Sequence, residues 1–388
     1  MSVAIGASVS TLADPFAAGA EAAASIRDAL GHAQPDLAVV FASGGHLSAP
    51  EALLEGIHDT LEPAALVGCG AGGVLGGGRE LESGTAVAAW AASFGGAGHA
   101  QAFHAQLSGD DVDGEIDDLP SAAHATGTVL LTDPYSFPAD AALASLAADA
   151  PAVPVLGGIA SARTPQGSAA LFLGEEVWET GAVGVHFDGV ELLPCVSQGA
   201  APFGRELTIT AAEGNVITEL AGRPALQTIE SVIGELTPRE RTLVAGGLLI
   251  GIVIDTGRPD YEQGDFLVRG VLGADRDTGA VAVGATVHAG QIVRLHARDA
   301  RSADEDLRRS LALRVGALAG RSPAGALVFS CNGRGRQMFG TADHDAGAVM
   351  RELGGAPSAG FFAAGEIGPV GGRSFLHGFT ATVAVFPS

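Results

Sequence analysis

The chain contains no lysine: all 21 of its basic residues are arginine. A protein without lysine cannot form a Schiff base with a carbonyl substrate, and it has no P-loop lysine for a nucleotide phosphate. Its arginines can still bind carboxylates through two parallel hydrogen bonds. Lysine-dependent catalysis and P-loop nucleotide binding are therefore excluded.

Cysteine is also scarce. Cys69, Cys195 and Cys331 are far apart in the sequence, so they form neither a disulfide framework nor a C-x-x-C zinc motif. This usage predicts a reducing compartment, the cytoplasm. The first 15 residues lack a basic segment followed by an apolar core, so we expect no signal peptide. The longest apolar run, Leu243 to Ile254, is too short to span a bilayer and predicts a buried strand.

Aromatic residues make up only 5% of the chain, although hydrophobic residues make up 47%. The core must therefore consist mainly of alanine, valine, leucine and isoleucine. The net charge is −23, and no basic run offsets it. Such a surface repels nucleic-acid phosphates and anionic membranes, so we expect neither as a partner.

Three stretches of the sequence follow one plan. Each has an apolar strand, a polar tip, a helix, a second apolar strand and a closing strand, as expected of a β-α-β-β unit. The predicted fold class is α/β, with two domains of mixed β-sheets flanked by helices and built from repeats of this unit. The first and closing strands of the three units are predicted at Leu37–Phe41 and Thr85–Trp90, Val129–Leu131 and Ala182–Phe187, and Ala326–Phe329 and Thr380–Phe386.

The region between the second and third units has a different pattern. A polar stretch around Gly214 separates it from the preceding repeats. The sequence therefore predicts an N-terminal domain over residues 1–214 and a C-terminal domain over residues 215–388.

A candidate binding site follows the first strand of the third unit. Asn332, Gly333 and Arg334 come at the strand end, where the ligand crevices of α/β sheets lie. Arg334 is predicted to hold a ligand carboxylate, and Glu366, beside Gly365, to hold an ammonium group. Together they suit a zwitterion such as an amino acid. The alternatives are that Arg334 caps a helix or that Arg334 and Glu366 pair with each other.

Two neighbouring features have both a structural and a functional interpretation. Cys331 is either a nucleophile, which needs a nearby base, or an inert thiol in the core. Gly70 belongs to a glycine loop, Gly68–Gly73, that satisfies G-x-G-x-x-G, but a strand rather than a helix follows it. The loop therefore favours a tight turn over a dinucleotide site, although its N–H groups could bind a carboxylate.

Two histidines are candidates for a different kind of site. His46, which is also a candidate contact of the small ligand, lies at a strand tip beside glycines, and His377 lies in the C-terminal segment. Either is a possible axial ligand of haem, which would also need a broad apolar pocket. The alternative for each is a surface histidine or a histidine satisfied in the core.

Several motifs resemble one known family. Ser330-Cys-Asn-Gly-Arg-Gly335, Gly360-Phe-Phe-Ala-Ala-Gly-Glu-Ile-Gly-Pro369 and Phe375-Leu-His-Gly-Phe-Thr380 are similar to the C-terminal FIST domain. Val67-Gly-Cys-Gly-Ala-Gly-Gly73 is similar to the N-terminal FIST domain. The resemblance runs from about residue 36 to residue 386.

The resemblance implies a sensory, non-enzymatic protein of intracellular signal transduction that binds a small ligand, an amino acid or related small carboxylate. It requires no cofactor for that role. Some FIST proteins are similar to haem-binding nitric-oxide sensors, which keeps haem as the alternative. Many members carry a signalling output domain, whereas both FIST halves account for this sequence. Any output is therefore expected to pass through a separate signalling protein.

Overall fold

The structure is a computed structural model that describes residues 3–96, 98–108, 116–255, 257 and 260–388. The chain forms two compact units. Unit 1 comprises Met1–Val196, Leu307–Leu376 and Ala381–Ser388, and unit 2 comprises Ser197–Asp306 and His377–Thr380. Both segments of unit 2 therefore interrupt the sequence of unit 1.

Unit 1 is built from three β-α-β-β repeats, as the sequence predicts. In each repeat the first and second strands are parallel, and the closing strand pairs with the first in antiparallel orientation. In each repeat a helix forms part of the connection between the two parallel strands. The elements are β2 (Leu37–Ser43), α2 (Pro50–Leu61), β3 (Leu66–Ala71) and β6 (Ala86–Ser93) in repeat 1; β9 (Gly127–Thr132), α3 (Ala139–Asp149), β10 (Val155–Ile159) and β13 (Ala182–Asp188) in repeat 2; and β22 (Pro323–Cys331), α8 (His344–Glu352), β23 (Ser358–Ala363) and β26 (Thr380–Pro387) in repeat 3.

Each repeat also contributes a β-hairpin that extends the sheet of another repeat. The hairpin of repeat 1 pairs with β23, that of repeat 2 with β3, and that of repeat 3 with β10. The exchange is cyclic, so each repeat completes the sheet of another. The hairpins are β4 (Val74–Gly76) with β5 (Arg79–Leu81), β11 (Leu171–Leu173) with β12 (Glu176–Trp178), and β24 (Glu366–Val370) with β25 (Arg373–His377).

A further strand lies beside the closing strand of each sheet. The three strand orders are β1-β6-β2-β3-β11-β12, β25-β24-β10-β9-β13-β7-β8 and β14-β26-β22-β23-β4-β5. In all three sheets the added strand is followed by the closing, first and second strands of one repeat and then by the hairpin of another. The added strands are β1 (Ala4–Ser10), β7 (His99–Leu107) with β8 (Ile116–Asp117), and β14 (Leu193–Gln198).

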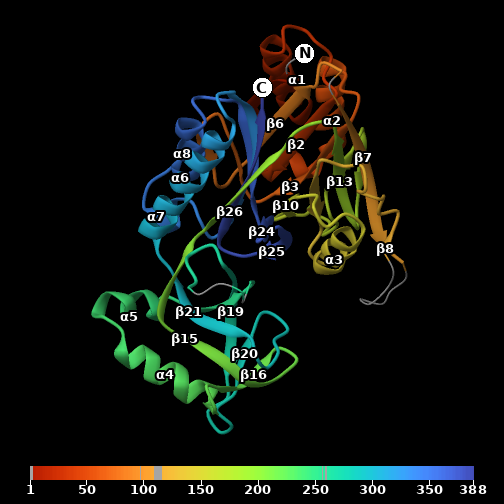
Figure 1. Cartoon of the computed structure of the whole chain (residues 1–388). Helices are drawn as coiled ribbons and strands as arrows, with labels where there is room; N and C mark the ends of the chain where they lie inside the picture. The colour runs from red at the N-terminus through yellow and green to blue at the C-terminus, as the bar shows by residue number, and fades with distance from the viewer. Residues whose placement is uncertain (1–2, 97, 109–115, 256, 258–259) are drawn as a thin grey trace. The chain divides into compact units, whose positions relative to one another are not determined.

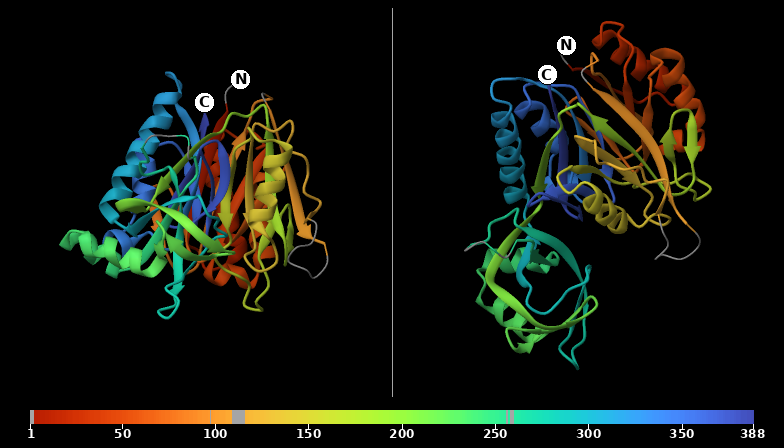
Figure 2. Two further views of the ribbon diagram at one scale, coloured as in Figure 1. Left: turned by 60° about the horizontal axis from the view of Figure 1, so that its bottom comes forward. Right: turned by 45° about the vertical axis from the view of Figure 1, so that its right-hand side comes forward.

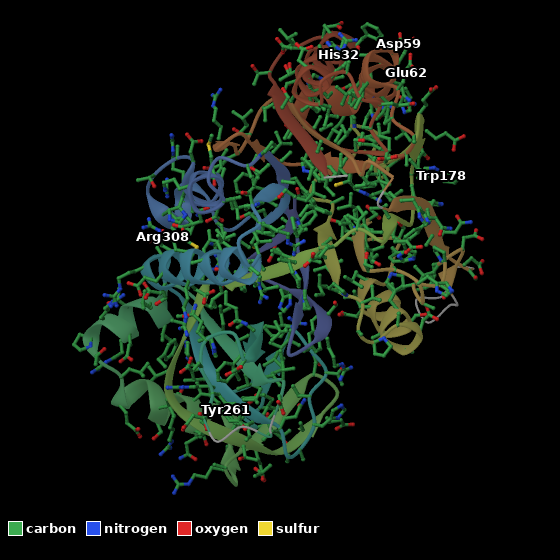
Figure 3. The ribbon with its side chains drawn as sticks, turned by 45° about the horizontal axis from the view of Figure 1, so that its top comes forward. His32, Asp59, Glu62, Trp178, Tyr261 and Arg308 are labelled. Atoms are coloured by element: carbon green, nitrogen blue, oxygen red, sulfur yellow. The ribbon has the colours of Figure 1, made fainter. Side chains whose placement is uncertain are left out.

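The first strands of the repeats are buried on both faces, which explains their continuous apolar sequences. Phe41, Phe329 and Phe361 pack together in the core, with ring centroids 4.9 to 6.3 Å apart. Helix α1 (Pro15–Ala29) and α2 cover the sheet of repeat 1, and α8 covers that of repeat 3 (Figure 1). Trp178 of β12 stacks on His104 at 3.9 Å (Figure 3).

Helices α1 and α2 approach each other closely because both carry a glycine at the contact. A Cβ atom on Gly19 would lie 2.3 Å from the carbonyl oxygen of Leu53. A Cβ atom on Gly56 would lie 2.2 Å from the carbonyl oxygen of Phe16. Any larger residue would force the helices apart.

Unit 2 is an antiparallel sheet that closes on itself. Its order is β15-β21-β18-β19-β20-β16-β17, and β15 also pairs with β16 (Figure 2). Apolar side chains such as Ile250 and Leu295 fill the interior. The elements are β15 (Ala200–Glu213), β16 (Val216–Leu220), β17 (Arg223–Pro224), α4 (Ala225–Glu235), α5 (Pro238–Ala245), β18 (Leu248–Val253), β19 (Phe266–Ala274), β20 (Val281–Val283) and β21 (Ile292–Arg298).

The compact units differ from the two halves of the sequence. Gly214, the predicted boundary, lies within unit 2 in the turn between β15 and β16, with a φ of 57°. Its polar surroundings therefore mark a hairpin turn. The chain returns to unit 1 within α6 (Ala300–Ala317). In the described part of the chain, no helix is long and apolar enough to cross a membrane.

Candidate functional site

A partly enclosed cavity of about 150 Å³ opens in unit 1 at the carboxyl ends of its strands. We call it the Arg334 cavity. All three repeats contribute to its wall, because the strand ends of the repeats meet there. The residues that line it are Gly72, Gly73 and Glu82 from repeat 1, Ser161 from repeat 2, and Asn332, Arg334 and Phe362 from repeat 3.

Hydrogen bonds join the wall segments of the three repeats. The backbone N–H of Gly72 donates to Ser161 Oγ at 2.9 Å, and the Ser161 hydroxyl donates to the carbonyl oxygen of Phe362. The N–H of Phe362 donates to the carbonyl oxygen of Gly73 at 3.0 Å. A Cβ atom at Gly73 would lie 2.7 Å from the carbonyl oxygen of Leu81, so this position requires glycine.

Arg334 lies three residues beyond the end of β22, in a turn where its N–H donates to the carbonyl oxygen of Cys331 at 2.9 Å. Its side chain has no exposed surface. Nε and Nη2 donate to the two carboxylate oxygens of Asp345, at 2.6 and 2.9 Å. Nη1 has no hydrogen-bond partner among the described residues. A buried cation with one unpaired donor atom therefore belongs to a residue that lines the cavity.

Asp345 fixes the position of this cation. It lies in the first turn of α8 and also accepts hydrogen bonds from Ser330 Oγ at 2.7 Å and His344 Nδ1 at 2.9 Å. Burial opposes ionisation of Asp345, but the charge of Arg334 and these hydrogen bonds outweigh it and hold the pKa of Asp345 below its usual 3.8. Burial likewise opposes the charge of Arg334, and Asp345 keeps its pKa above the ordinary value. Both groups are therefore ionised at neutral pH.

The hairpin of repeat 1 brings two carboxylates to this site. Glu80 is buried, and its Oε1 accepts the backbone N–H groups of Asp345 and Ala346 at 2.7 and 2.9 Å, which satisfies the N-terminus of α8. Burial raises the pKa of Glu80. Glu82 is exposed at the cavity, and its Oε1 accepts the N–H of Arg336 at 2.8 Å. Glu82 thus supplies negative charge to the wall that contains Arg334.

The predicted binding residues fall into two groups. Arg334 and Asn332 line the Arg334 cavity, and Gly333 lies between them. Glu366 is buried at the start of β24, and its charge acts on Arg334. The carboxylate that binds Arg334 in two parallel hydrogen bonds is that of Asp345, not Glu366 or a ligand.

The remaining predicted contacts lie in the surrounding framework. Gly365 accepts a hydrogen bond from Ile159 N at 2.8 Å, which ties β24 to repeat 2. Gly70 belongs to β3 and donates to the carbonyl oxygen of Ala170 at 2.7 Å, so it lies in a strand and not in the predicted loop. The later glycines, at positions 72 and 73, are those that reach the cavity.

Cys331 is the last residue of β22 and is buried. Its thiol lies 3.9 Å from Oδ1 of Asn332. An amide is not a base that could activate a thiol for nucleophilic attack. This contact therefore fits the core interpretation of Cys331.

Sequence reasoning missed Glu80, Glu82, Ser161 and Asp345. The first two arrive through the exchanged hairpin, which no local pattern connects with repeat 3. A signal for the hairpin itself was present, since Gly77-Gly78 is a typical turn sequence, and both glycines have positive φ, 57° and 76°. No local sequence pattern indicates Ser161, because its hydrogen bonds reach residues of the two other repeats.

His46 occupies in repeat 1 the position that Arg334 occupies in repeat 3. Ser43 pairs with Ala71 at the end of the parallel strands of repeat 1, and Cys331 pairs with Ala363 at the same place in repeat 3. His46 lies three residues after Ser43, and Arg334 lies three residues after Cys331. His46 has no exposed surface, and among the described residues neither ring nitrogen has a hydrogen-bond partner. Burial lowers the pKa of His46, although Asp14 acts in the opposite direction. The imidazole is therefore neutral.

The surroundings do not fit haem. An axial histidine usually donates its second ring N–H to a carboxylate or carbonyl, and His46 has no such partner among the described residues. The residues that line the Arg334 cavity include neither His46 nor His377. The Arg334 cavity is also smaller than the roughly 300–1,000 Å³ pockets that hold drug-sized ligands. We therefore derive no function through haem.

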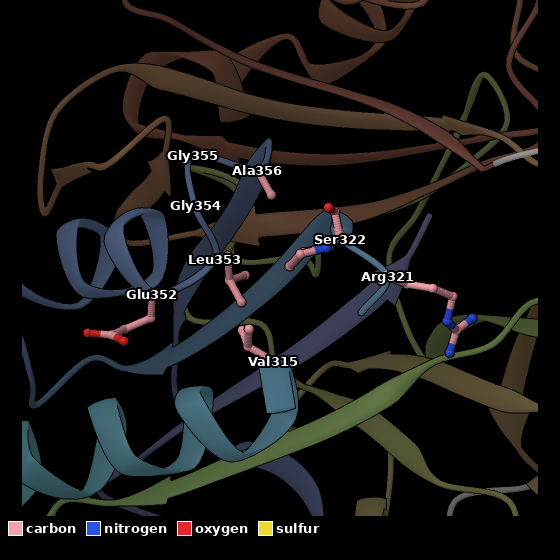
Figure 4. Close-up of a pocket in the computed structure, with 9 residues that line it drawn as sticks. Val315, Arg321, Ser322, Glu352, Leu353, Gly354, Gly355 and Ala356 are labelled. Carbon is pink, nitrogen blue, oxygen red and sulfur yellow. The ribbon is translucent and has the colours of Figure 1, made fainter. Parts of the chain in front are cut away.

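A larger cavity of about 370 Å³ lies where α6 and α8 end (Figure 4). Val315 and Leu353 form its apolar floor, whereas Glu352 and Arg321 point away from it. Arg321 instead pairs with Glu191 at 2.7 Å. This cavity is larger, but its two charged side chains, Glu352 and Arg321, point away from it, so the Arg334 cavity is the better candidate site. In the described part of the chain, no group of three or more histidine, cysteine or acidic residues is placed to hold a metal ion.

Comparison with known proteins agrees with the resemblance of the motifs. A family model for the FIST N domain matches residues 36–223, and one for the FIST C domain matches residues 225–369. An uncharacterized protein of Mycobacterium tuberculosis is 45% identical over 387 residues, which cover 98% of this chain and 99% of the relative. An uncharacterized protein of Mycobacterium bovis is 43% identical over 387 residues, 98% of each chain.

Proposed function

Because this chain belongs to the FIST family, we propose that it is a sensor that binds an amino acid or related small carboxylate in the Arg334 cavity. FIST domains are sensory domains of signal transduction, and this favours binding without catalysis. In this proposal a separate signalling protein reads the bound state. The protein itself needs no cofactor for the task.

One observation carries the proposal: Nη1 of Arg334 is a buried, charged donor without a protein partner among the described residues. Leaving such a group unsatisfied costs free energy, and buried polar groups in proteins are nearly always bonded. A carboxylate in the cavity would accept this hydrogen bond. Asp345 holds the guanidinium in place beforehand, so binding requires little further ordering.

The charges favour a zwitterion over a simple anion. Asp345 already neutralises Arg334, and Glu82 adds a carboxylate to the wall. An amino acid can place its carboxylate at Nη1 and the amide of Asn332 while its ammonium group faces Glu82. A cavity of about 150 Å³ is known to hold a molecule the size of benzene, which points to a small amino acid.

Calorimetry on the full chain tests this proposal. Small amino acids such as L-alanine and L-serine should bind, and propionate, which lacks the ammonium group of alanine, should bind more weakly. Glu82→Gln should weaken amino-acid binding about three- to tenfold, the effect of one lost charge-assisted contact at an exposed rim. Glu82 follows β5 as Glu179 follows β12, so Glu179→Gln is a matched control with unchanged affinity. Equal affinities for alanine and propionate would contradict the zwitterion site.

A further inference from the structure

Helix α7 (Arg336–Phe339) is a single turn between two glycines. Gly335 and Gly340 have φ values of 73° and 72°, a conformation that favours glycine, and none of the four helical residues is buried. A helix of one turn has little stability of its own. The position of this segment, Gly335–Gly340, therefore depends on the few contacts it makes outside itself. We call it the α7 segment.

Its contacts lead to the wall of the Arg334 cavity. At one end, the N–H of Arg336 donates to Glu82 Oε1 at 2.8 Å. At the other end, the ring of Phe339 lies 5.1 Å from the guanidinium carbon of Arg334 and stacks on His344 at 3.4 Å. Arg334 and Glu82 are the two charged residues of the cavity wall. The α7 segment is thus anchored on Glu82 and Arg334, the two groups proposed to bind the ligand, and on His344, which hydrogen-bonds to Asp345, the partner of Arg334.

We propose that the α7 segment is ordered by the ligand and presents the occupied state of the Arg334 cavity at the protein surface; this rests on the proposed function. Glu82 is exposed, so water competes for the hydrogen bond between its carboxylate and Arg336 N–H. An ammonium group bound to Glu82 holds the carboxylate in the position that also accepts Arg336 N–H. Arg336 and Gln337 are exposed and therefore accessible to a signalling partner.

The coupling must be reciprocal. If the ligand binds more tightly when the α7 segment is ordered, then a change that disorders this segment must lower the apparent affinity, because less of the protein is in the binding-competent state. Phe339→Ala removes the ring that packs against Arg334 but changes no residue that lines the cavity, and it should lower the affinity for the amino acid. Gln337→Ala changes an exposed residue of the same turn and should leave affinity unchanged.

Hydrogen exchange of backbone amides tests the proposal. In the full chain without ligand, Glu82→Ala should speed exchange at Arg336 and Phe339 about three- to tenfold, the factor expected from one exposed hydrogen bond. Glu179→Ala, the matched change in the hairpin of repeat 2, should not. Saturating L-alanine or L-serine should slow exchange at the same amides in the wild-type protein.

The outcomes separate this inference from the proposed function. If calorimetry shows that L-alanine or L-serine binds while exchange in the α7 segment is unchanged, the coupling is wrong and the binding site stands. If Glu82→Ala leaves exchange unchanged, the anchoring of the α7 segment is wrong whatever binds. If neither amino acid gives a binding heat, the proposed function fails and the coupling fails with it.

Discussion

Arg334 and Asp345 form an ion pair in which neither side chain has any exposed surface. The pair joins the tip of β22 to the first turn of α8, eleven residues later. Removing two charges from water is costly, and such a pair adds little net stability. Its effect here is to fix the Arg334 guanidinium while Nη1 has no hydrogen-bond partner among the described residues.

The ion pair predicts a large loss of stability when one partner is removed. Arg334→Met should lower the free energy of unfolding by about 3–5 kcal/mol, because Asp345 then remains buried without its counter-charge. The double variant Arg334→Met/Asp345→Leu should recover much of this loss. Urea denaturation measures both, with Arg336→Gln as an exposed control that changes stability by about 0.5 kcal/mol or less. Equal losses in the single and double variants would contradict this account of the pair.

Ser161 predicts a different effect, because its hydroxyl bridges two other repeats. Ser161→Ala leaves Gly72 N–H and the carbonyl oxygen of Phe362 without this partner. We expect a loss of about 1–2 kcal/mol in urea denaturation. Ser83→Ala, at an exposed position, should have no measurable effect. A Ser161→Ala variant as stable as wild type would show that the bridge does not contribute.

His296 in unit 2 predicts acid sensitivity. Its Nδ1–H donates to the carbonyl oxygen of Arg294 at 3.0 Å, and burial lowers its pKa from 6.5 to about 4. The unfolded chain therefore binds a proton at a higher pH than the folded chain does. Stability from this group is complete above pH 6.5 and is lost as the pH falls towards 4, by up to about 3 kcal/mol. Urea denaturation between these pH values measures the free energy of unfolding. This free energy should depend less steeply on pH in His296→Leu than in the wild-type protein, and an unchanged pH dependence would contradict the assignment.

Within the part of the chain that the structure describes, His46 lacks the second hydrogen bond that usually orients an axial haem ligand, and this also makes a prediction. Titration of the protein with haemin should give no stoichiometric Soret band, because His46 is buried and neither of its ring nitrogens has a partner among the described residues that would orient it as an axial ligand. Absorption spectroscopy measures this directly, with His46→Ala and His377→Ala as controls. A band that saturates at one equivalent and disappears in one of these variants would restore the haem alternative.

The sequence contained much of the fold. The three repeats were predictable because each first strand is buried on both faces, which gives continuous apolar segments such as that ending at Phe41. Other elements were not. Leu243–Ile254 was predicted as one strand, but its beginning belongs to α5 and only Leu248–Val253 is a strand. Gly246 and Gly247 separate the two, and an apolar run alone does not distinguish helix from strand.

The candidate site was predictable only in part. Arg334 and Asn332 follow a strand end, and that position indicates a crevice. The partner of Arg334 was not predictable, because four carboxylates follow it within the same repeat. Only the start of α8 brings one of them, Asp345, into line with the guanidinium. Glu82 depends on the exchange of hairpins between repeats, a long-range pairing that has no local pattern.

The most direct test of the central claim is a crystal structure of the full chain with the amino acid that calorimetry selects. We predict a ligand carboxylate oxygen within hydrogen-bond distance of Arg334 Nη1 and the ammonium group beside Glu82. Electron density for the amino acid elsewhere on the protein, with the Arg334 cavity filled only by water, would contradict the claim.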